Sequence, residues 1–385
     1  MQKTDVLVVG AGPAGSSAAK KVAGAGFTVQ VFEEHPIVGF PLACGEGMSQ
    51  PMLNRFPWAP KEGQPIEIQY LNFAGGYYGY IRINALSINR PVFDRKLIDI
   101  AQDEGAYLHT NTPVKYLART SYGIEATTSQ GIKTLAKIVI AADGPSSRMM
   151  RQMKLAPPNE IIQGVEYRVK GVEVEGFQFY FDFSITPHGY GWVFNKGERI
   201  ANVGICLSGG KNPRERLDKF RKMRNLNGKI DQLIAGIIPS GGPVQQCFTD
   251  NFMVAGDAGG FTNPIFFGGI GTAMLTGSLA GETAVEALEE EDYSAWKLAH
   301  YEQKIQELPI VSQDLLQSHE LLYHYFNNSD LARLGVLINT REFRFSSSDK
   351  LILLGRCFRH PSTWSRLAAF YQLMKGFRIS RDWGF

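Results

Sequence analysis

The chain has 385 residues, of which 44% are hydrophobic, and its formal net charge is only +3. A chain of this length and composition can bury a full hydrophobic core and is expected to form two or three interlocked domains. The small net charge argues against a nucleic-acid partner. The four cysteines stand far apart without a C-x-x-C pair, which argues against an iron–sulfur cluster and a disulfide framework.

The sequence contains no apolar run of the ~18 residues that a membrane span needs, and no secretory leader precedes the first expected strand. We therefore expect a cytoplasmic protein in a reducing compartment. The charge is uneven, because the segment from Arg333 to the end holds ten Lys/Arg against three acids. This basic segment is also rich in aromatic residues, a mixture that suits the surface of an anionic membrane. It suits equally well a set of helices that pack on the domain with a basic outer face.

A glycine-rich turn with Gly10, Gly12 and Gly15 follows the first apolar strand, and a small-residue helix is expected over residues 16–25. Glycines at this spacing permit a tight turn, a close approach of the backbone to a pyrophosphate, and close packing of helix on strand. A second strand ends at Glu33, where a carboxylate can accept hydrogen bonds from a ribose. These features predict a Rossmann-like dinucleotide site, without separating NAD from FAD.

A second cofactor motif begins where a buried strand leads to Asp257, followed by a glycine-rich segment that opens a long helix through residue 288. The Asp257 carboxylate can accept a hydrogen bond from a ribityl hydroxyl. The N-terminus of the helix can stabilise negative charge on a reduced flavin. Two motifs so far apart in the sequence suit a long cofactor, FAD, bound across a composite domain.

Several segments of the sequence resemble the geranylgeranyl reductase family of flavoproteins, within the wider p-hydroxybenzoate hydroxylase-like group. They are the Gly10 fingerprint, the P-x-x-C-G-E-G element at 41–47, and the segments 90–97, 142–144 and 256–257. The resemblance covers roughly residues 1–290 and implies reduction of isolated carbon–carbon double bonds in isoprenoid chains. The lipid substrate that it implies favours peripheral membrane contact for the basic C-terminal segment. The resemblance also implies FAD contacts at Ala14, Glu33, Cys44, Gly45, Gly47, Arg90, Val114, Asp257, Gly269 and Ile270.

Alternating phenylalanines over 177–183 predict a half-buried antiparallel strand, which strands over 189–194 and 199–207 continue. In the family the corresponding Y-x-W-x-F element faces the lipid chain, which implies substrate contacts for Tyr190, Trp192 and Phe194. Asn195 replaces the usual proline after this element. From the residues alone, plain sheet core is the simpler interpretation. Phe267 stands where the family usually has a glycine, and its ring is expected to narrow the substrate pocket.

The expected fold is therefore α/β, with strands and helices in three regions. A discontinuous Rossmann-like FAD-binding domain spans 1–70, 88–157 and 245–290. An inserted antiparallel β-sheet spans 71–87 and 158–244 and forms the substrate domain. A C-terminal helical region spans 291–385.

Cys44 lies between glycines on a loop that is expected to cover the flavin face. An unpolarised alkene accepts hydride only if a proton reaches its other carbon. We therefore hypothesise that the Cys44 loop excludes water and supplies or relays this proton, although positioning of flavin or substrate is the simpler role for the thiol.

Other features leave alternatives open. No second nicotinamide motif is present, so the electron donor must visit the flavin, and it can be NAD(P)H, ferredoxin or another carrier. His319 and His324 are five residues apart, roughly 140° around an α-helix, so no metal site is expected. The alternative activities are an FAD-dependent monooxygenase of the same wider fold, a quinone-reducing electron-transfer flavoprotein, and a non-catalytic prenyl-lipid carrier.

Overall fold

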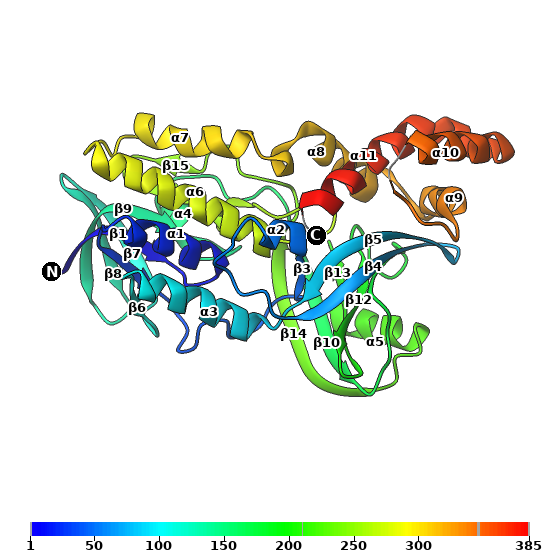
Figure 1. The fold of residues 1–385 in the computed structure, drawn as a ribbon, viewed down its shortest axis with the longest axis horizontal. Coiled ribbons are helices and arrows are strands. Elements are labelled where there is room, and N and C mark those ends of the chain that lie inside the picture. The colour runs from blue at the N-terminus through cyan, green and yellow to red at the C-terminus, as the bar shows by residue number, and fades with distance from the viewer. Residues whose placement is uncertain (1, 210, 345–346, 384–385) are drawn as a thin grey trace.

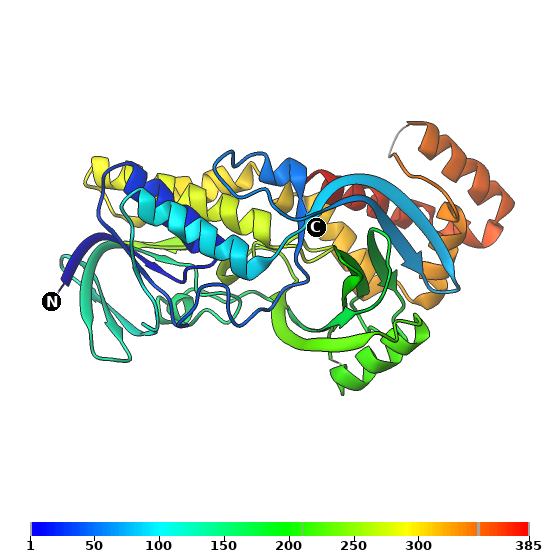
Figure 2. The same ribbon diagram turned by 60° about the horizontal axis from the view of Figure 1, so that its bottom comes forward.

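The computed structural model describes residues 2–209, 211–344 and 347–383. Two large sheets follow one another along the long axis of the molecule, and a row of helices runs along one side of both (Figure 1). The N-terminus lies at one end of this axis, and the tip formed by the later helices lies at the other (Figure 2).

The first sheet carries the Rossmann-like motif. Its strands are β1 (Gln2–Val9), β2 (Val29–Phe32), β6 (Tyr107–His109), β7 (Val114–Thr120), β8 (Gly123–Thr128), β9 (Lys133–Ala141), β15 (Phe248–Thr249) and β16 (Phe252–Val254). Their order is β15-β16-β9-β1-β2-β6, with β8 paired to β9 and β7 to β8. β1 has parallel partners on both sides, and residues 6–9 are buried, as the continuous apolar run predicts for a central parallel strand.

The helices beside the first sheet are α1 (Pro13–Gly24), α3 (Arg90–Asp103), α4 (Arg148–Gln152), η1 (Gly256–Gly259), α6 (Ile270–Glu289) and α7 (Ala295–Gln306). Two glycines of α6 allow it to pack directly on α1. A Cβ on Gly277 would lie 2.0 Å from the carbonyl oxygen of Ala14, and one on Gly281 would lie 2.6 Å from that of Ala18. This close packing brings the two predicted cofactor motifs together.

The second sheet contains β3 (Gly47–Ser49), β4 (Gln64–Phe73), β5 (Tyr77–Ser87), β10 (Ile161–Lys170), β11 (Phe177–Phe181), β12 (Gly191–Gly197), β13 (Ile200–Leu207) and β14 (Lys229–Pro239), with the short helices α2 (Gln50–Leu53) and α5 (Pro213–Met223) nearby. The order is β14-β10-β13-β12-β11-β4-β5-β3. Its pairs are antiparallel, as expected, except that β11 runs parallel to β4. β4 pairs with β5 from residue 64 onward, so residues 64–70 belong to this sheet.

The C-terminal region is helical, with η2 (Pro309–Val311), α8 (Gln313–His319), the π-helix η3 (Glu320–Tyr325), α9 (Asn328–Ile338), α10 (Ser347–Arg359), η4 (Pro361–Arg366) and α11 (Leu367–Trp383). An aromatic core joins these helices to the second sheet, where Phe181 lies against Phe377 with ring centroids 6.3 Å apart. Within the described ranges, no helix combines the length and the apolar character that crossing a membrane requires.

Candidate functional site

A cavity of about 1320 Å³, part of it open to solvent, lies where the two sheets and the N-terminus of α6 meet. Both predicted cofactor motifs and the predicted aromatic element contribute to its lining. The predicted site residues among the lining residues are Gly12, Ala14, Cys44, Gly45, Gly47, Arg90, Tyr190, Trp192, Phe194, Asp257, Phe267, Gly269 and Ile270. Segments that lie far apart in the sequence therefore share one space.

Four predicted site residues lie outside this lining. Gly10 has φ +101°, and a Cβ on Gly15 would lie 1.8 Å from the carbonyl oxygen of Gly10, so both glycines shape the turn from beneath. Glu33 braces the same turn, because its Oε2 accepts a hydrogen bond from the backbone N–H of Ala11 at 2.8 Å. Val114 is buried at the start of β7.

Asp257 is a half-buried residue whose carboxylate lines the cavity. No hydrogen bond to its side chain is found among the described residues, and burial raises its pKa although the charge of Arg90 acts against this. A carboxylate at a cavity that receives no hydrogen bond from the protein is available to a ligand hydroxyl bound there. On the opposite side, a Cβ on Gly12 would meet no atom within 4 Å, so the backbone here borders open space. Both observations fit a flavin dinucleotide.

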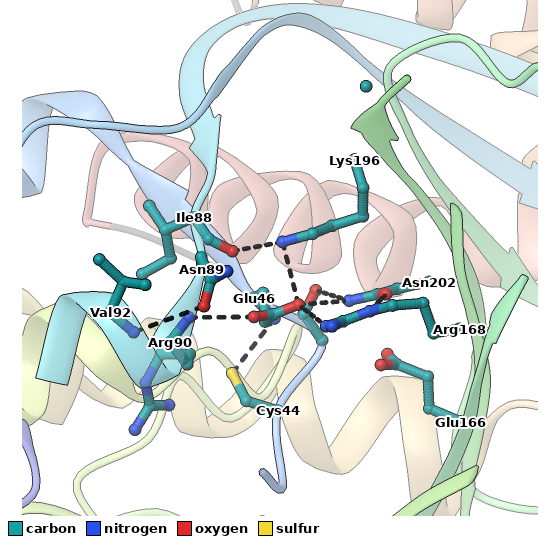
Figure 3. A network of polar contacts seen from close by, with 12 residues as sticks. Cys44, Glu46, Ile88, Asn89, Arg90, Val92, Glu166, Arg168, Lys196 and Asn202 are labelled. Carbon is teal, nitrogen blue, oxygen red and sulfur yellow. Dashed lines mark hydrogen bonds and ion pairs between the residues drawn. The ribbon is translucent and has the colours of Figure 1, made fainter. Parts of the chain in front are cut away.

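Glu46 fixes the Cys44 loop to the second sheet (Figure 3). Its Oε1 accepts a hydrogen bond from the backbone N–H of Arg90 at 3.0 Å. Its Oε2 accepts one from Asn202 at 3.0 Å and forms ion pairs with Lys196, at 2.9 Å, and with Arg168. Burial opposes the negative charge, but the two cations and the hydrogen bonds outweigh it, and the pKa of Glu46 lies below its usual value. The group is therefore a carboxylate at neutral pH.

Cys44 faces the cavity from this loop. Its Sγ accepts a hydrogen bond from the backbone N–H of Glu46 at 3.2 Å. Burial raises the pKa of the thiol, and this outweighs the opposing effect of the Arg90 charge. The thiol is therefore protonated at neutral pH, as a proton carrier must be, and it is not a reactive thiolate.

Glu166, on β10, is a lining residue that the sequence analysis missed. Its Oε2 accepts a hydrogen bond from Nε1 of Trp192 at 2.6 Å, and burial raises the pKa of the carboxyl to about 8. The sequence contained a partial signal, because Glu166 and Arg168 alternate with apolar residues on a strand and so share one face. The residues that contact this face could not be predicted, because they come from distant segments of the sequence.

Comparison with known proteins connects this geometry to a family. Residues 160–238 match the geranylgeranyl reductase catalytic domain, and residues 8–46 match an NAD(P)-binding Rossmann-like domain. The chain is 35% identical to digeranylgeranylglycerophospholipid reductase 1 of Methanopyrus kandleri, over 79% of this chain and 86% of the relative. It is 30% identical to the digeranylgeranylglycerophospholipid reductase of Methanosphaerula palustris, over 92% and 94% of the two chains. The chain belongs to the geranylgeranyl reductase family.

A solved structure has a fold similar to that of this chain. It is the geranylgeranyl bacteriochlorophyll reductase-like protein of Thermoplasma acidophilum, with a TM-score of 0.85 and 27% identity, covering 96% of this chain and 100% of the other. Membership in this family confirms two expectations, that the protein is an FAD-dependent oxidoreductase and that its cofactor is FAD. The glycine turn and the unpaired Asp257 carboxylate are the features of this chain that fit FAD.

Phe267, which was expected to stand where the family has a glycine, has a strained backbone. Its φ of +53° lies in the left-handed region, where a glycine is favoured and a bulky residue costs about 1–2 kcal/mol. Stacking offsets this cost, because the ring centroid lies 5.4 Å from that of Tyr190 and 5.2 Å from that of Tyr323. Phe267 therefore holds a phenyl ring at the cavity surface, in a position where a glycine would leave space.

His319 and His324 meet at one carboxylate, contrary to the expectation that they face different ways. Nε2 of each ring lies 3.1 Å from Oε2 of Glu160. The expected separation of roughly 140° holds for an α-helix, whereas residues 320–325 form a π-helix with i to i+5 hydrogen bonds. The three ligand atoms lie within 4.8 Å of one another, so the reason given for expecting no metal site was wrong. The hydrogen bond from His319 lowers the pKa of Glu160 to about 2.

Proposed function

We propose that this protein hydrogenates carbon–carbon double bonds in an isoprenoid chain carried by a membrane lipid, of the kind named in its digeranylgeranylglycerophospholipid reductase relatives. One observation carries the proposal. The aromatic rings of Tyr190, Trp192 and Phe194 line the same cavity as Asp257 and the Cys44 loop. An apolar chain on these rings would have its double bond beside the flavin.

We assign each part of the cavity a role in this reaction. FAD supplies hydride when it is bound and reduced. The residues proposed to contact it are Gly10, Gly12, Ala14, Gly15, Glu33, Cys44, Gly45, Gly47, Arg90, Val114, Asp257, Gly269 and Ile270. Tyr190, Trp192, Phe194 and Phe267 are proposed to contact the lipid chain, and the Cys44 loop to exclude water from it. Phe267 narrows this space and thereby selects the shape of the chain.

The proposed domain limits follow the two sheets. The FAD-binding domain takes the first sheet with α1 and α6, and the substrate domain takes the second sheet, including all of β4. The electron donor is proposed to be a transient visitor, with NAD(P)H and ferredoxin as the candidates to test. We place the protein in the cytoplasm, in contact with the membrane surface.

The tip formed by α10 and η4 is the surface that supports membrane contact. Phe358 is 72% exposed, Trp364 55% and Leu354 43%, and the rings of Phe358 and Trp364 contact each other edge to face. Exposed apolar side chains among basic residues suit the boundary between lipid headgroups and acyl chains. This tip is at the far end of the molecule from the N-terminus (Figure 2).

Anaerobic turnover tests the proposed function. Purified protein is reduced with dithionite and mixed with unsaturated archaeal-type lipid, and the products are analysed by mass spectrometry. We expect the mass to increase by one hydrogen molecule for each double bond reduced, without oxygen. A product that forms only with oxygen and contains an added oxygen atom identifies a monooxygenase. Unchanged lipid mass with oxidation of the flavin by a quinone identifies an electron-transfer protein, and unchanged lipid without flavin oxidation identifies a carrier.

Cys44→Ser tests the proposed contribution of the thiol. If the thiol takes part in delivering the proton, the substitution slows alkene reduction far more than it slows flavin reduction by an artificial donor. Equal slowing of both steps contradicts a chemical contribution and indicates a structural one. Both steps are measured by stopped-flow absorbance of the flavin.

A further inference from the structure

Glu166 is a buried acid whose carboxyl group lies beside the Cys44 loop. The residue is 2% exposed, and a Cβ on Gly45 would lie 3.5 Å from its Oε2. Its Oε1 is buried and has no hydrogen-bond partner in the described part of the chain, whereas Oε2 accepts the hydrogen bond from Trp192. Figure 3 shows the carboxyl turned toward the loop that carries Cys44. A buried polar atom left without a partner at a cavity surface is a group available to a ligand.

Two glutamates of this region have opposite protonation states. Glu46 is held as a carboxylate by Lys196 and Arg168. Burial raises the pKa of Glu166 to about 8, and the negative charge of Glu46 adds to this, so Glu166 is a neutral carboxylic acid at pH 7. When environments push the pKa values of neighbouring acids apart, the group with the raised pKa is the one suited to give up a proton.

We propose that Glu166 is a catalytic acid, which protonates one carbon of the substrate double bond while hydride reaches the other carbon. This inference rests on the proposed function. Three bonds break: the alkene π bond, the O–H bond of Glu166, and the N–H bond of reduced FAD that supplies the hydride. Two C–H bonds form, one from the hydride and one from the proton, and FAD is left oxidised. The flavin loses two electrons with the hydride, and the carboxylate of Glu166 regains a proton from solvent before the next turnover.

Glu166 is better suited to this step than the Cys44 thiol. Burial raises the pKa of the thiol above its ordinary value of 9.0, whereas that of Glu166 is about 8, so Glu166 is the stronger acid. The charges of Arg168 and Lys196 act on Glu166 and favour its ionised form. The carboxylate left after proton transfer is therefore stabilised by cations that are already in place.

Glu166→Gln removes the proton and keeps an oxygen that can accept the hydrogen bond from Trp192. We expect single-turnover alkene reduction by the pre-reduced variant to fall by about 10²- to 10⁴-fold, the usual contribution of a general acid. Flavin reduction by dithionite and FAD content should not change. Glu166→Asp restores an acid on a shorter side chain and should recover part of the rate. Glu173→Gln, at a side chain 79% exposed, is the matched control and should behave as wild type.

The thermal stability of the apoprotein tests the protonation state of Glu166 without an activity measurement. A group with a raised pKa in the folded state binds its proton more tightly there than in the unfolded chain. Wild type therefore loses stability as pH rises from 4.5 to about 8, and the Glu166→Gln variant lacks this loss. The difference in Tm, variant minus wild type, should rise across this window and then level off. A constant difference from pH 5 to 9 shows that Glu166 is ionised in the folded state and overturns the proposal.

The two possible failures can be distinguished. If wild type saturates the lipid and Glu166→Gln does so within threefold of the same rate, the proposal for Glu166 is wrong and the proposed function stands. If wild type saturates no isoprenoid lipid, the proposed function fails and the catalytic role of Glu166 fails with it. If the variant loses FAD, the melting series and Glu166→Asp decide the question.

Discussion

The two sides of the cavity are made from different parts of the chain. On the side of the first sheet, the backbone does most of the shaping, with open space at Gly12, a tight turn at Gly10, and a single unpaired carboxylate at Asp257. On the side of the second sheet, charged side chains meet in a network. The Arg168–Glu46 pair there joins residues 122 positions apart in the sequence.

This contrast predicts different kinds of sensitivity. A site made of backbone and glycines has little to titrate, so its mutations should act through steric clashes and through the affinity for FAD. A site made of buried charges should respond to pH and to the loss of any one partner, because a charge left without its partner is costly to bury. Mutations on the two sides can therefore distinguish steric and cofactor-affinity effects from the effects of losing a buried charge partner.

The largest effect is expected for Glu46→Gln, on the second-sheet side. The change leaves Arg168 and Lys196 without their carboxylate, although their side chains are only 19% and 11% exposed. We expect a loss of about 3–5 kcal/mol in the free energy of unfolding of the apoprotein, measured in urea at pH 7.

The pH dependence of this loss gives a second check. Because the pKa of Glu46 is lowered in the folded state, its contribution is fully present above the ordinary value of 4.5 and is lost as pH falls through the folded pKa. The difference between wild type and Glu46→Gln should shrink below pH 4.5. A difference that stays the same at pH 7 and pH 3.5 would show that the charge network does not stabilise the fold.

The first-sheet side offers a matched pair of glycine substitutions. In Gly15→Ala the new Cβ would lie 1.8 Å from a backbone oxygen, so we expect the apoprotein to lose about 1–3 kcal/mol of stability. In Gly12→Ala the Cβ meets no protein atom within 4 Å, so the apoprotein should melt at the wild-type temperature while FAD binds more weakly. Unchanged FAD affinity in Gly12→Ala would contradict the placement of the dinucleotide against this turn.

The same contrast explains what the sequence could predict. The glycine turns, the strand ending near Asp257 and the helix after it are local patterns, and the structure places them within about three residues of the expected positions. The pairing of the aromatic strands was also predictable, because their alternation is local. The ion pairs of Glu46 and the position of Glu166 were not predictable, because each depends on contacts between distant parts of the sequence. The proximity of His319 to His324 depends on a π-helix, which no local pattern of residues predicted.

A smaller effect is expected for Asp257→Ala, which removes the unpaired carboxylate. A hydrogen bond to a charged group contributes about 1.5–3 kcal/mol, so the Kd for FAD should rise by roughly 10- to 100-fold. Asp257 is half-buried and has no hydrogen-bond partner among the described side chains, so the apoprotein should not lose stability. Binding is followed by quenching of FAD fluorescence. An unchanged Kd would mean that this carboxylate does not contact the cofactor, and a less stable apoprotein would mean that it has a structural role.

The smallest effect concerns the tip at the C-terminal end. Arg359 and Arg366 are two basic residues of this tip, but Arg366 forms an ion pair at 3.0 Å with the buried Asp330. Changing Arg366 would disturb the packing as well as the surface charge. Arg359 is exposed, and Phe358 and Trp364 are the exposed aromatics beside it, so these three positions provide a cleaner test.

Arg359→Glu should weaken binding to anionic vesicles by about 1–2 kcal/mol at low salt, since each basic residue near such a surface contributes ~1 kcal/mol and the new acid is repelled. This difference should fade at physiological salt, where the Debye length is about 8 Å. Phe358→Ser with Trp364→Ser should weaken binding equally at low and high salt, because apolar burial is not screened. Co-sedimentation with vesicles measures both effects. Wild-type protein that does not bind anionic vesicles even at low salt would show that the tip only packs against the domain, and that the lipid reaches the cavity by another route.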